Sequence, residues 1–306
     1  MRASNARNPQ RAAAYSKGRV ASADGTTISY RQLGHGPGLV LLHGGVNAAH
    51  HMMKLGLALA DAYTVYLPDR RGRGMSGPVG REYSIEREDE DLAAVVNQTG
   101  AEFVFGPADG GLFALHGVIG LDRVRKVAAY EPLLLLGHRD DAEIQRVFTT
   151  MQDLIRSGHG GAAIVFSSAE SATRAARDGH FPAWLAAVIR HLPVGPTGRL
   201  VDLLLRLQPA RGDTVAWRDL LAALPPELDV VLGTQGTLDD YRRLEADVLL
   251  MYGSQTDPIF VNTAQELHRV LPRSTVMQLP GLNHDSAQTY GKPAAIAAAL
   301  RQFLGA

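Results

Sequence analysis

The stretch FVFGPADGGLFAL, residues 103–115, passes from one kind of structure to another without a loop. Phe103–Phe105 form an apolar run typical of a buried strand, and an apolar helical pattern begins after Gly111. The residues between them, GPADG, are mostly small and allow the backbone to turn sharply. The stretch therefore predicts a tight strand-to-helix turn with Ala108 at its apex.

The identity of residue 108 raises the first question about function. In the catalytic turn G-x-S-x-G, a serine nucleophile occupies the apex, and small residues stand two positions before and after it. Here Gly106 and Gly110 satisfy the flanking positions, but the apex is Ala108. The turn is either a nucleophile position without its hydroxyl group or part of a site with different chemistry.

Composition excludes several classes of site and partner. The 306 residues are 45% hydrophobic and 20% charged, as in ordinary globular enzymes. The absence of cysteine excludes disulfides, cysteine metal ligands and a thiol nucleophile. The 31 basic and 31 acidic residues cancel, so no overall charge favours nucleic acid or an anionic membrane, and we expect neither as a partner. The sequence predicts no cofactor and says nothing about oligomeric state.

The first 17 residues differ in composition from the rest of the chain. They are basic, contain no acid and have no apolar core, so they do not resemble a secretory signal. We expect a flexible tail here and a cytoplasmic location. No apolar run in the chain approaches the roughly 20 residues that span a bilayer.

Segments typical of strands alternate with segments typical of helices over most of the chain. A hairpin pattern around Asp24-Gly25 precedes the buried-strand pattern GLVLLHGG at 38–45. The alternation predicts a mostly parallel, doubly wound α/β sheet for residues 18–133 and 241–306. Residues 134–240 interrupt it with helical stretches at 142–158, 182–192, 198–208 and 215–224. We expect this insert to be a helical cap over the carboxyl ends of the strands.

Four motifs occur in the order and spacing of one fold family. They are LLHGG at 41–45, LPDRRGRGMSG at 67–77, GPADGG at 106–111, and the pair YGSQTDP and LPGLNHDS near the carboxyl terminus. With these motifs, residues 18–306 resemble the α/β-hydrolase superfamily, in particular its capped esterase- and lactonase-like branch. The resemblance implies an eight-stranded sheet, an inserted helical cap, and a nucleophile serine replaced by Ala108.

The resemblance also implies roles for residues near the ends of the later strands. The chain order in this fold is nucleophile, acid, histidine. This order assigns His284 as general base and Asp257 as the acid that orients it. Glu131 is the competing acid, because some relatives place their acid after the sixth strand. The other reading of Asp257 is a turn residue before a proline.

The loop after His43 is the expected oxyanion-binding part of the site. Backbone N–H groups of Gly45 and Asp109 are the expected donors, because glycine permits close approach and a helix N-terminus favours negative charge. Gly44 and Val46, in the same loop, are expected to contact the substrate. No metal ligands are predicted.

Three explanations for Ala108 stay open. The first is a serine hydrolase inactivated by a serine-to-alanine replacement, which loses covalent catalysis but keeps its binding site. The second is a native lyase, cyclase or isomerase that uses His284 and Asp257 as a general base. The third is a non-catalytic binding homologue. The apolar composition of residues 134–240 predicts a medium-sized apolar small molecule, which for a hydrolase is an ester, lactone or thioester.

Overall fold

The computed structural model describes residues 15–136, 139–177, 179–180, 182–208, 210 and 212–305. The flexible tail expected at residues 1–17 falls almost entirely outside these ranges. Within the described part of the chain, no helix is both long enough and apolar enough to cross a membrane.

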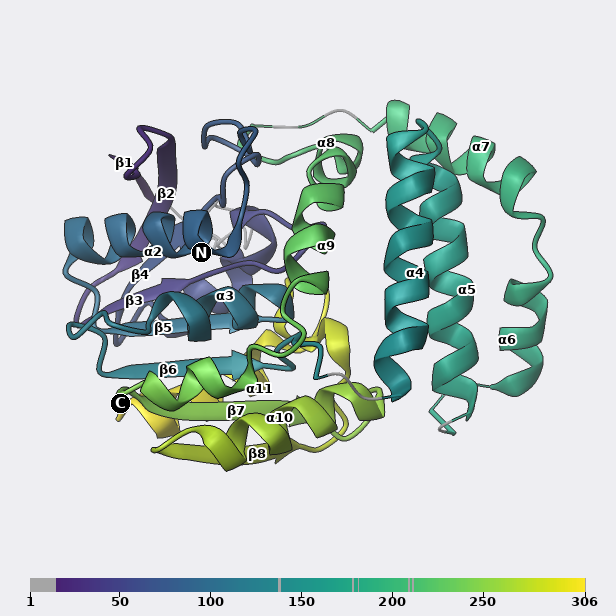
Figure 1. Ribbon diagram of the computed structural model, residues 1–306. Helices are drawn as coiled ribbons and strands as arrows, with labels where there is room; N and C mark the ends of the chain where they lie inside the picture. Colours follow the sequence, from purple (N-terminus) through teal and green to yellow (C-terminus); the bar gives the residue numbers. More distant parts are fainter. Residues whose placement is uncertain are drawn as a thin grey trace, which may run out of the picture.

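An eight-stranded sheet forms the centre of the molecule (Figure 1). Its strands are β1 (Ser16–Ala21), β2 (Thr27–Gly34), β3 (Gly38–Leu41), β4 (Thr64–Pro68), β5 (Phe103–Pro107), β6 (Lys126–Tyr130), β7 (Asp247–Gly253) and β8 (Ser274–Leu279). They follow the order β1-β2-β4-β3-β5-β6-β7-β8 across the sheet. Strand β2 pairs antiparallel with β1 and β4, and all the other pairs are parallel. The predicted mostly parallel sheet with an antiparallel start is confirmed.

Helices cover both faces of this sheet. Because side chains along a strand point alternately to the two faces, each face has a hydrophobic core of its own. Val40 packs on the face covered by α2 (Ile85–Thr99), α3 (Asp109–Gly117) and α10 (Pro258–Val270). Leu39 and Leu41 pack on the other face, under α1 (Met53–Leu59) and α11 (Pro293–Leu304). Short 3-10 segments lie at η1 (Ala49–Met52), η2 (Leu238–Arg243) and η3 (His284–Ala287). Burial on both faces explains why the central strands are continuous apolar runs in the sequence.

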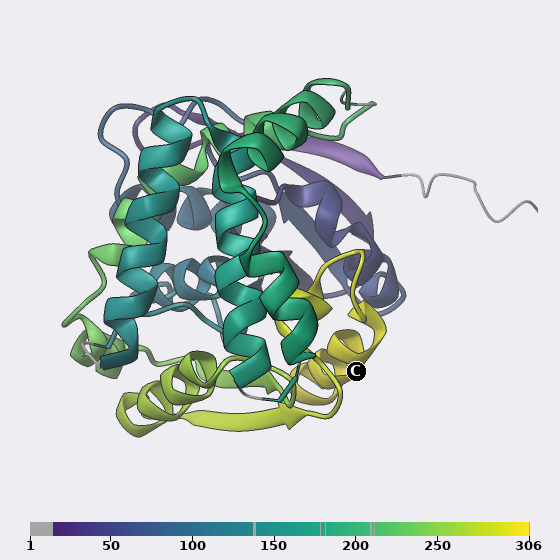
Figure 2. The same cartoon turned by 90° about the vertical axis from the view of Figure 1, so that its right-hand side faces the viewer.

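The described residues between 139 and 232 form six helices on the side of the sheet where its parallel strands have their carboxyl ends. They are α4 (Arg139–Arg156), α5 (Gly160–Arg177), α6 (Ala183–Arg190), α7 (Val194–Arg206), α8 (Trp217–Ala222) and α9 (Leu224–Leu232). Helices α4–α7, called the helical layer below, stand beyond the carboxyl ends of β5 and β6 (Figures 1 and 2). Sequence patterns predicted α4, α6, α7 and α8 but missed α5 and α9. Both missed helices contribute side chains to the site.

The turn after β5 has the tight geometry that its composition predicted. Ala108 adopts φ 52° and ψ −127°, a conformation that is strained for residues other than glycine. Its N–H donates to the Tyr130 carbonyl at 2.9 Å, which ties the turn to the end of β6. A Cβ on Gly106 would lie 2.0 Å from the Gly110 carbonyl oxygen, so only glycine fits at position 106.

Gly106→Ala is expected to lower the free energy of unfolding by about 3 kcal/mol or more, because the added methyl group meets backbone that cannot move aside. Gly195→Ala is the matched control. Gly195 in α7 has open space around it, and alanine in a helix is more favourable than glycine by about 0.5–1 kcal/mol. Urea denaturation should therefore give opposite signs for the two variants, and a stable Gly106→Ala protein would contradict this account of the turn.

Candidate active site

A cavity of about 400 Å³ lies between the carboxyl ends of the strands and the helical layer. Ala108 and His284 both line it. Most of its wall is apolar and comes both from the α/β core and from the segment between residues 134 and 240. The apolar lining includes Leu133, Ile144, Phe148, Met151, Leu224 and Phe260. Ser171, Arg174 and His180 give it one polar side. Its volume falls in the range of small-molecule pockets, about 300–1,000 Å³.

His284 is held by a carboxylate, and that carboxylate belongs to Glu131. His284 begins η3, and its Nδ1 lies 2.8 Å from Glu131 Oε2. The imidazole stacks on the Phe260 ring with the ring centroids 4.5 Å apart, and 41% of the histidine side chain remains exposed. With Nδ1 occupied, Nε2 is the nitrogen left to exchange a proton on the cavity side.

Glu131 is fully buried directly after β6, in a backbone conformation with φ 50°. Its Oε1 accepts the Gly253 N–H at 2.9 Å, which fixes the carboxylate beside His284. Burial acts to raise the pKa of this carboxyl group, but the hydrogen bond and charge of His284 lower the pKa overall. Burial acts to lower the pKa of His284, and the hydrogen bond and charge of Glu131 raise it above its usual value. Each group therefore stabilises the charged form of the other.

Asp257, the acid expected to orient His284, occupies a different place. It is the N-cap of α10, where Oδ1 accepts the Ile259 N–H at 3.1 Å. Its Oδ2 forms an ion pair with Arg174 Nε at 2.8 Å. The structure thus corrects the expected contact: the imidazole binds Glu131, and Asp257 caps a helix. The other interpretation of Asp257 from its sequence was a turn residue; the Asp-Pro dipeptide is also typical of a helix start, which is what the structure shows.

The two expected oxyanion donors lie beside the turn, but the N–H of Gly45 already donates a hydrogen bond to a side chain. The Gly45 N–H donates to Asp109 Oδ1 at 2.5 Å. The Asp109 N–H stands at the start of α3, where a helix offers it no carbonyl partner. A Cβ on Gly44 would lie 3.5 Å from the Ala108 Cβ, and Val46 lines the cavity with a φ of 52°. The loop therefore lies against the turn, although the Asp109 side chain accepts the hydrogen bond of one expected donor, the Gly45 N–H.

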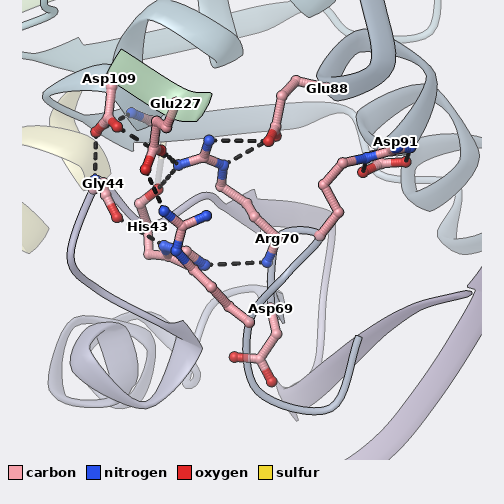
Figure 3. A network of polar contacts seen from close by, with 12 residues as sticks. His43, Gly44, Asp69, Arg70, Glu88, Asp91, Asp109 and Glu227 are labelled. Atoms are coloured by element: carbon pink, nitrogen blue, oxygen red, sulfur yellow. Dashed lines mark hydrogen bonds and ion pairs between the residues drawn. The ribbon is translucent and has the colours of Figure 1, made fainter. Parts of the chain in front are cut away.

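The side chain of Asp109 belongs to a buried network that no sequence pattern signalled (Figure 3). Glu227, fully buried in α9, forms ion pairs with Arg70 and Arg73 and shares a hydrogen bond with Asp109. Burial acts to raise the pKa of Glu227, but the charges of the two arginines lower it strongly. Burial and the charge of Glu227 raise the pKa of Asp109 well above its usual range. Within this pair the two shifts therefore favour a proton on Asp109 over a proton on Glu227.

Arg70 connects this pair of carboxyl groups to the core (Figure 3). Its Nε and Nη2 each lie 3.0 Å from an oxygen of Glu88, and its guanidinium lies 4.2 Å from the centroid of the Phe113 ring. Its backbone N–H donates to His43 Nε2 at 3.1 Å. Arg71 is also buried and pairs with an aspartate on α2 at 2.7 Å. The arginines of the DRRGRG motif therefore stabilise the interior and do not form an exposed basic surface.

Histidines and acids do not gather into a metal-binding group in the part of the chain that the structure describes. No group of three or more His, Asp or Glu side chains there is arranged to hold a metal ion. His116 pairs with Asp89 at 2.8 Å, and His51 accepts the Ala48 N–H at 3.1 Å. Both histidines have local structural partners, and neither is among the residues that line the cavity.

The arrangement of the sheet, the turn and the histidine is that of a known family. The sequence matches the alpha/beta hydrolase family over residues 39–299, which is most of the chain. The chain therefore belongs to the alpha/beta hydrolase family.

Similar proteins of known sequence or structure include hydrolases and an esterase. An uncharacterised hydrolase, YraK, from Bacillus subtilis is 33% identical over 144 residues, 42% of this chain and 49% of that protein. A pimeloyl-[acyl-carrier protein] methyl ester esterase from Xanthomonas campestris is 35% identical over 132 residues, 42% of this chain and 51% of that enzyme. The chain spans about half the length of these curated relatives. The crystal structure of an alpha/beta hydrolase from Sphaerobacter thermophilus is 27% identical, with a TM-score of 0.68 and coverage of 94% of this chain and 100% of that one.

Glu131→Gln is expected to lower the pKa of His284, because the amide keeps the shape of the carboxylate and removes its charge. Asp257→Asn is the matched control and should leave the pKa of His284 unchanged, since Asp257 pairs with Arg174. Titration of the imidazole signals by NMR in both variants measures the difference. A larger shift in Asp257→Asn would reverse the assignment of the acid.

Proposed function

We propose that this fold carries an ester-type hydrolase site, with residue 108 at the nucleophile position, His284 as general base and Glu131 as the acid that orients it. The observation that carries the proposal is the hydrogen bond of 2.8 Å between His284 and Glu131, beside a cavity that Ala108 also lines. An acyl-transfer site needs a base beside its nucleophile and a carboxylate on the other nitrogen of that base. The base and the carboxylate are present in this chain.

The nucleophile is the missing part. A methyl group at position 108 cannot form an acyl-enzyme, and loss of a triad nucleophile lowers turnover by about 10⁶-fold while binding largely survives. We infer that this chain is the binding-competent, covalently inactive form of such a hydrolase. The strained backbone of Ala108 supports this, because a turn that presents no reactive group gains nothing from its strain.

The cavity favours a medium-sized and largely apolar acyl compound. Its volume of about 400 Å³ and its wall of aliphatic and aromatic side chains suit such a molecule. The helical layer would then act as the cap, with residues 134–240 as the inserted segment. One relative is a methyl ester esterase, and we propose an ester, lactone or thioester as the bond for this site.

A second function is favoured by one observation, the engagement of the Gly45 N–H by Asp109. With one oxyanion donor occupied and no hydroxyl group at position 108, His284 would still be able to take a proton from a bound substrate. A lyase, cyclase or isomerase of this kind needs no acyl-enzyme.

Ala108→Ser is expected to create hydrolysis of p-nitrophenyl esters, with turnover at least about 10³-fold above the parent, because the new hydroxyl group has His284 as its base. Stopped-flow measurement of p-nitrophenol release should show a burst that matches the enzyme concentration. Only neutral imidazole acts as a base, and the pKa of His284 is raised. The rate should therefore increase as the pH rises through this pKa.

Two further variants separate the hydroxyl group from other effects at position 108. Ala108→Gly relieves the backbone strain without adding a hydroxyl group, so it should stay inactive. Ala108→Ser/His284→Ala should lose the gain. If Ala108→Ser hydrolyses nothing while His284→Ala abolishes a turnover of the parent protein, the second function is the correct one.

Ala108→Ser/Asp109→Ala is expected to exceed Ala108→Ser by about 10²-fold in kcat, because the Gly45 N–H becomes free and one oxyanion donor contributes about 10²–10³-fold. Glu227 keeps its two arginines in this variant, and Arg70, which also lies 3.8 Å from Asp109, keeps Glu88 and Glu227. Steady-state kinetics on one ester should show little change in KM. Equal kcat values would show that the Asp109 carboxyl group does not block the donor.

A further inference from the structure

The outer helices of the helical layer reverse the usual pattern of a surface helix. The buried residues of α6 and α7 are small, namely Ala186 and Gly198. Gly198 packs against α5, where an added Cβ would lie 2.6 Å from the Ala162 backbone. A surface helix normally buries its large apolar side chains. In α6 and α7 many of the large apolar side chains are exposed instead, and others, such as Leu185 and Leu205, are only half-buried.

These outward side chains, on two helices that both pack on α5, are called the outer patch below. Its most exposed members are Trp184 at 71% and Leu207 at 68%, and more than half of each side chain is also exposed at Val188, Leu200, Leu203 and Leu204. Figure 2 shows α6 and α7 on the side of the helical layer that is turned away from the sheet. Exposed apolar surface of this extent typically marks an interaction site.

The outer patch also carries positive charge without balancing acids. Arg190, Arg199 and Arg206 make no ion pair within the described residues. Asp202 is the one acid between residues 182 and 208, and its Oδ1 accepts the Gly161 N–H at 2.6 Å. The whole chain has no net charge, so this excess of arginine is local. We expected no membrane partner because the chain as a whole is neutral, but the charge of this surface is positive.

We propose that the outer patch docks on an anionic phospholipid bilayer and lies on its surface without crossing it. Trp184 and the exposed leucines would enter the boundary between headgroups and acyl chains, and the arginines would meet the lipid phosphates. Stable attachment to a bilayer surface needs an apolar and an electrostatic contribution together, and this surface supplies both. A second copy of the chain fits less well, because a twofold contact would place the same arginines opposite one another without an acid.

Docking in this way places the cavity close to the lipid. Helix α5 packs on α6 and α7, and it also supplies Ser171 and Arg174 to the cavity wall. An apolar acyl substrate would then reach the cavity from the lipid phase. This last step rests on the proposed function, whereas the docking itself does not.

Sedimentation of the full chain with lipid vesicles tests the docking. Vesicles with about 30% phosphatidylserine in phosphatidylcholine should bind the chain, and vesicles of phosphatidylcholine alone should bind it much less. Binding to the anionic vesicles should fall as salt rises from about 0.05 to 0.5 M. The chain has two tryptophans, so Trp217→Phe isolates the emission of Trp184, which should shift to shorter wavelength on binding.

Variants separate the apolar contribution from the electrostatic one. Trp184→Ser/Leu203→Ser should lower the bound fraction at least tenfold, because both side chains enter the lipid boundary. Arg199→Gln/Arg206→Gln should weaken binding to anionic vesicles by about thirtyfold and change binding to neutral vesicles little. Leu57→Ser is the matched control, since Leu57 is 43% exposed but belongs to α1 of the core. Circular dichroism shows that each variant is folded.

Three outcomes would overturn the docking. The first is a parent protein that stays in the supernatant with every vesicle. The second is equal loss of binding in Leu57→Ser. The third is a dimer, seen by analytical ultracentrifugation, that Trp184→Ser/Leu203→Ser abolishes while vesicles stay unbound, which would assign the outer patch to a second copy of the chain. None of these readouts uses ester hydrolysis, so a failure of the proposed function is recognised separately.

Discussion

The site depends on one backbone turn, the passage from β5 to α3. Because Gly106 has no Cβ, the strand turns directly into the helix and holds Ala108 at φ 52°. The Ala108 N–H bonds the Tyr130 carbonyl at 2.9 Å, and the Leu133 N–H bonds the Ala108 carbonyl at 3.2 Å. Glu131 lies between these two contacts along the chain. The same local structure therefore fixes both the apex of the turn and the carboxylate that holds the histidine.

Backbone strain is concentrated at this point. In the described ranges, the non-glycine residues with positive φ are Val46, Ala108 and Glu131, and each lies on the cavity or on His284. Such conformations cost about 1–3 kcal/mol each, and they persist only where the surrounding structure over-determines them. The buried ion pairs around Arg70 and the bonds between the turn and β6 supply that rigidity. This clustering of strain is typical of a site that must hold groups in fixed positions.

The sequence predicted the fold well because the signals of the fold are local. Apolar runs, glycine-rich turns and motif order specify the sheet and the position of His284. The carboxylate that contacts His284 was harder to predict, because Glu131 and His284 are 153 residues apart and Asp257 had the expected chain order. Glu227 was harder to predict, because it lies within the insert, which has no motif, and its arginine partners are 157 and 154 residues away. Contacts of this kind follow from tertiary packing, which no short pattern contains.

The network around Glu227 gives α9 a chemical role at the turn. Burial and the charge of Glu227 raise the pKa of Asp109, the two arginines lower the pKa of Glu227, and the Gly45 N–H donates to Asp109 Oδ1 at 2.5 Å. A chain of contacts thus runs from α9 through Asp109 to the loop that faces Ala108. If α9 moved away, Asp109 would lose the charge that raises its pKa and the hydrogen bond that it shares with Glu227. The segment between β6 and β7 therefore does more than line the cavity, since it also contacts the carboxyl group that accepts the Gly45 N–H.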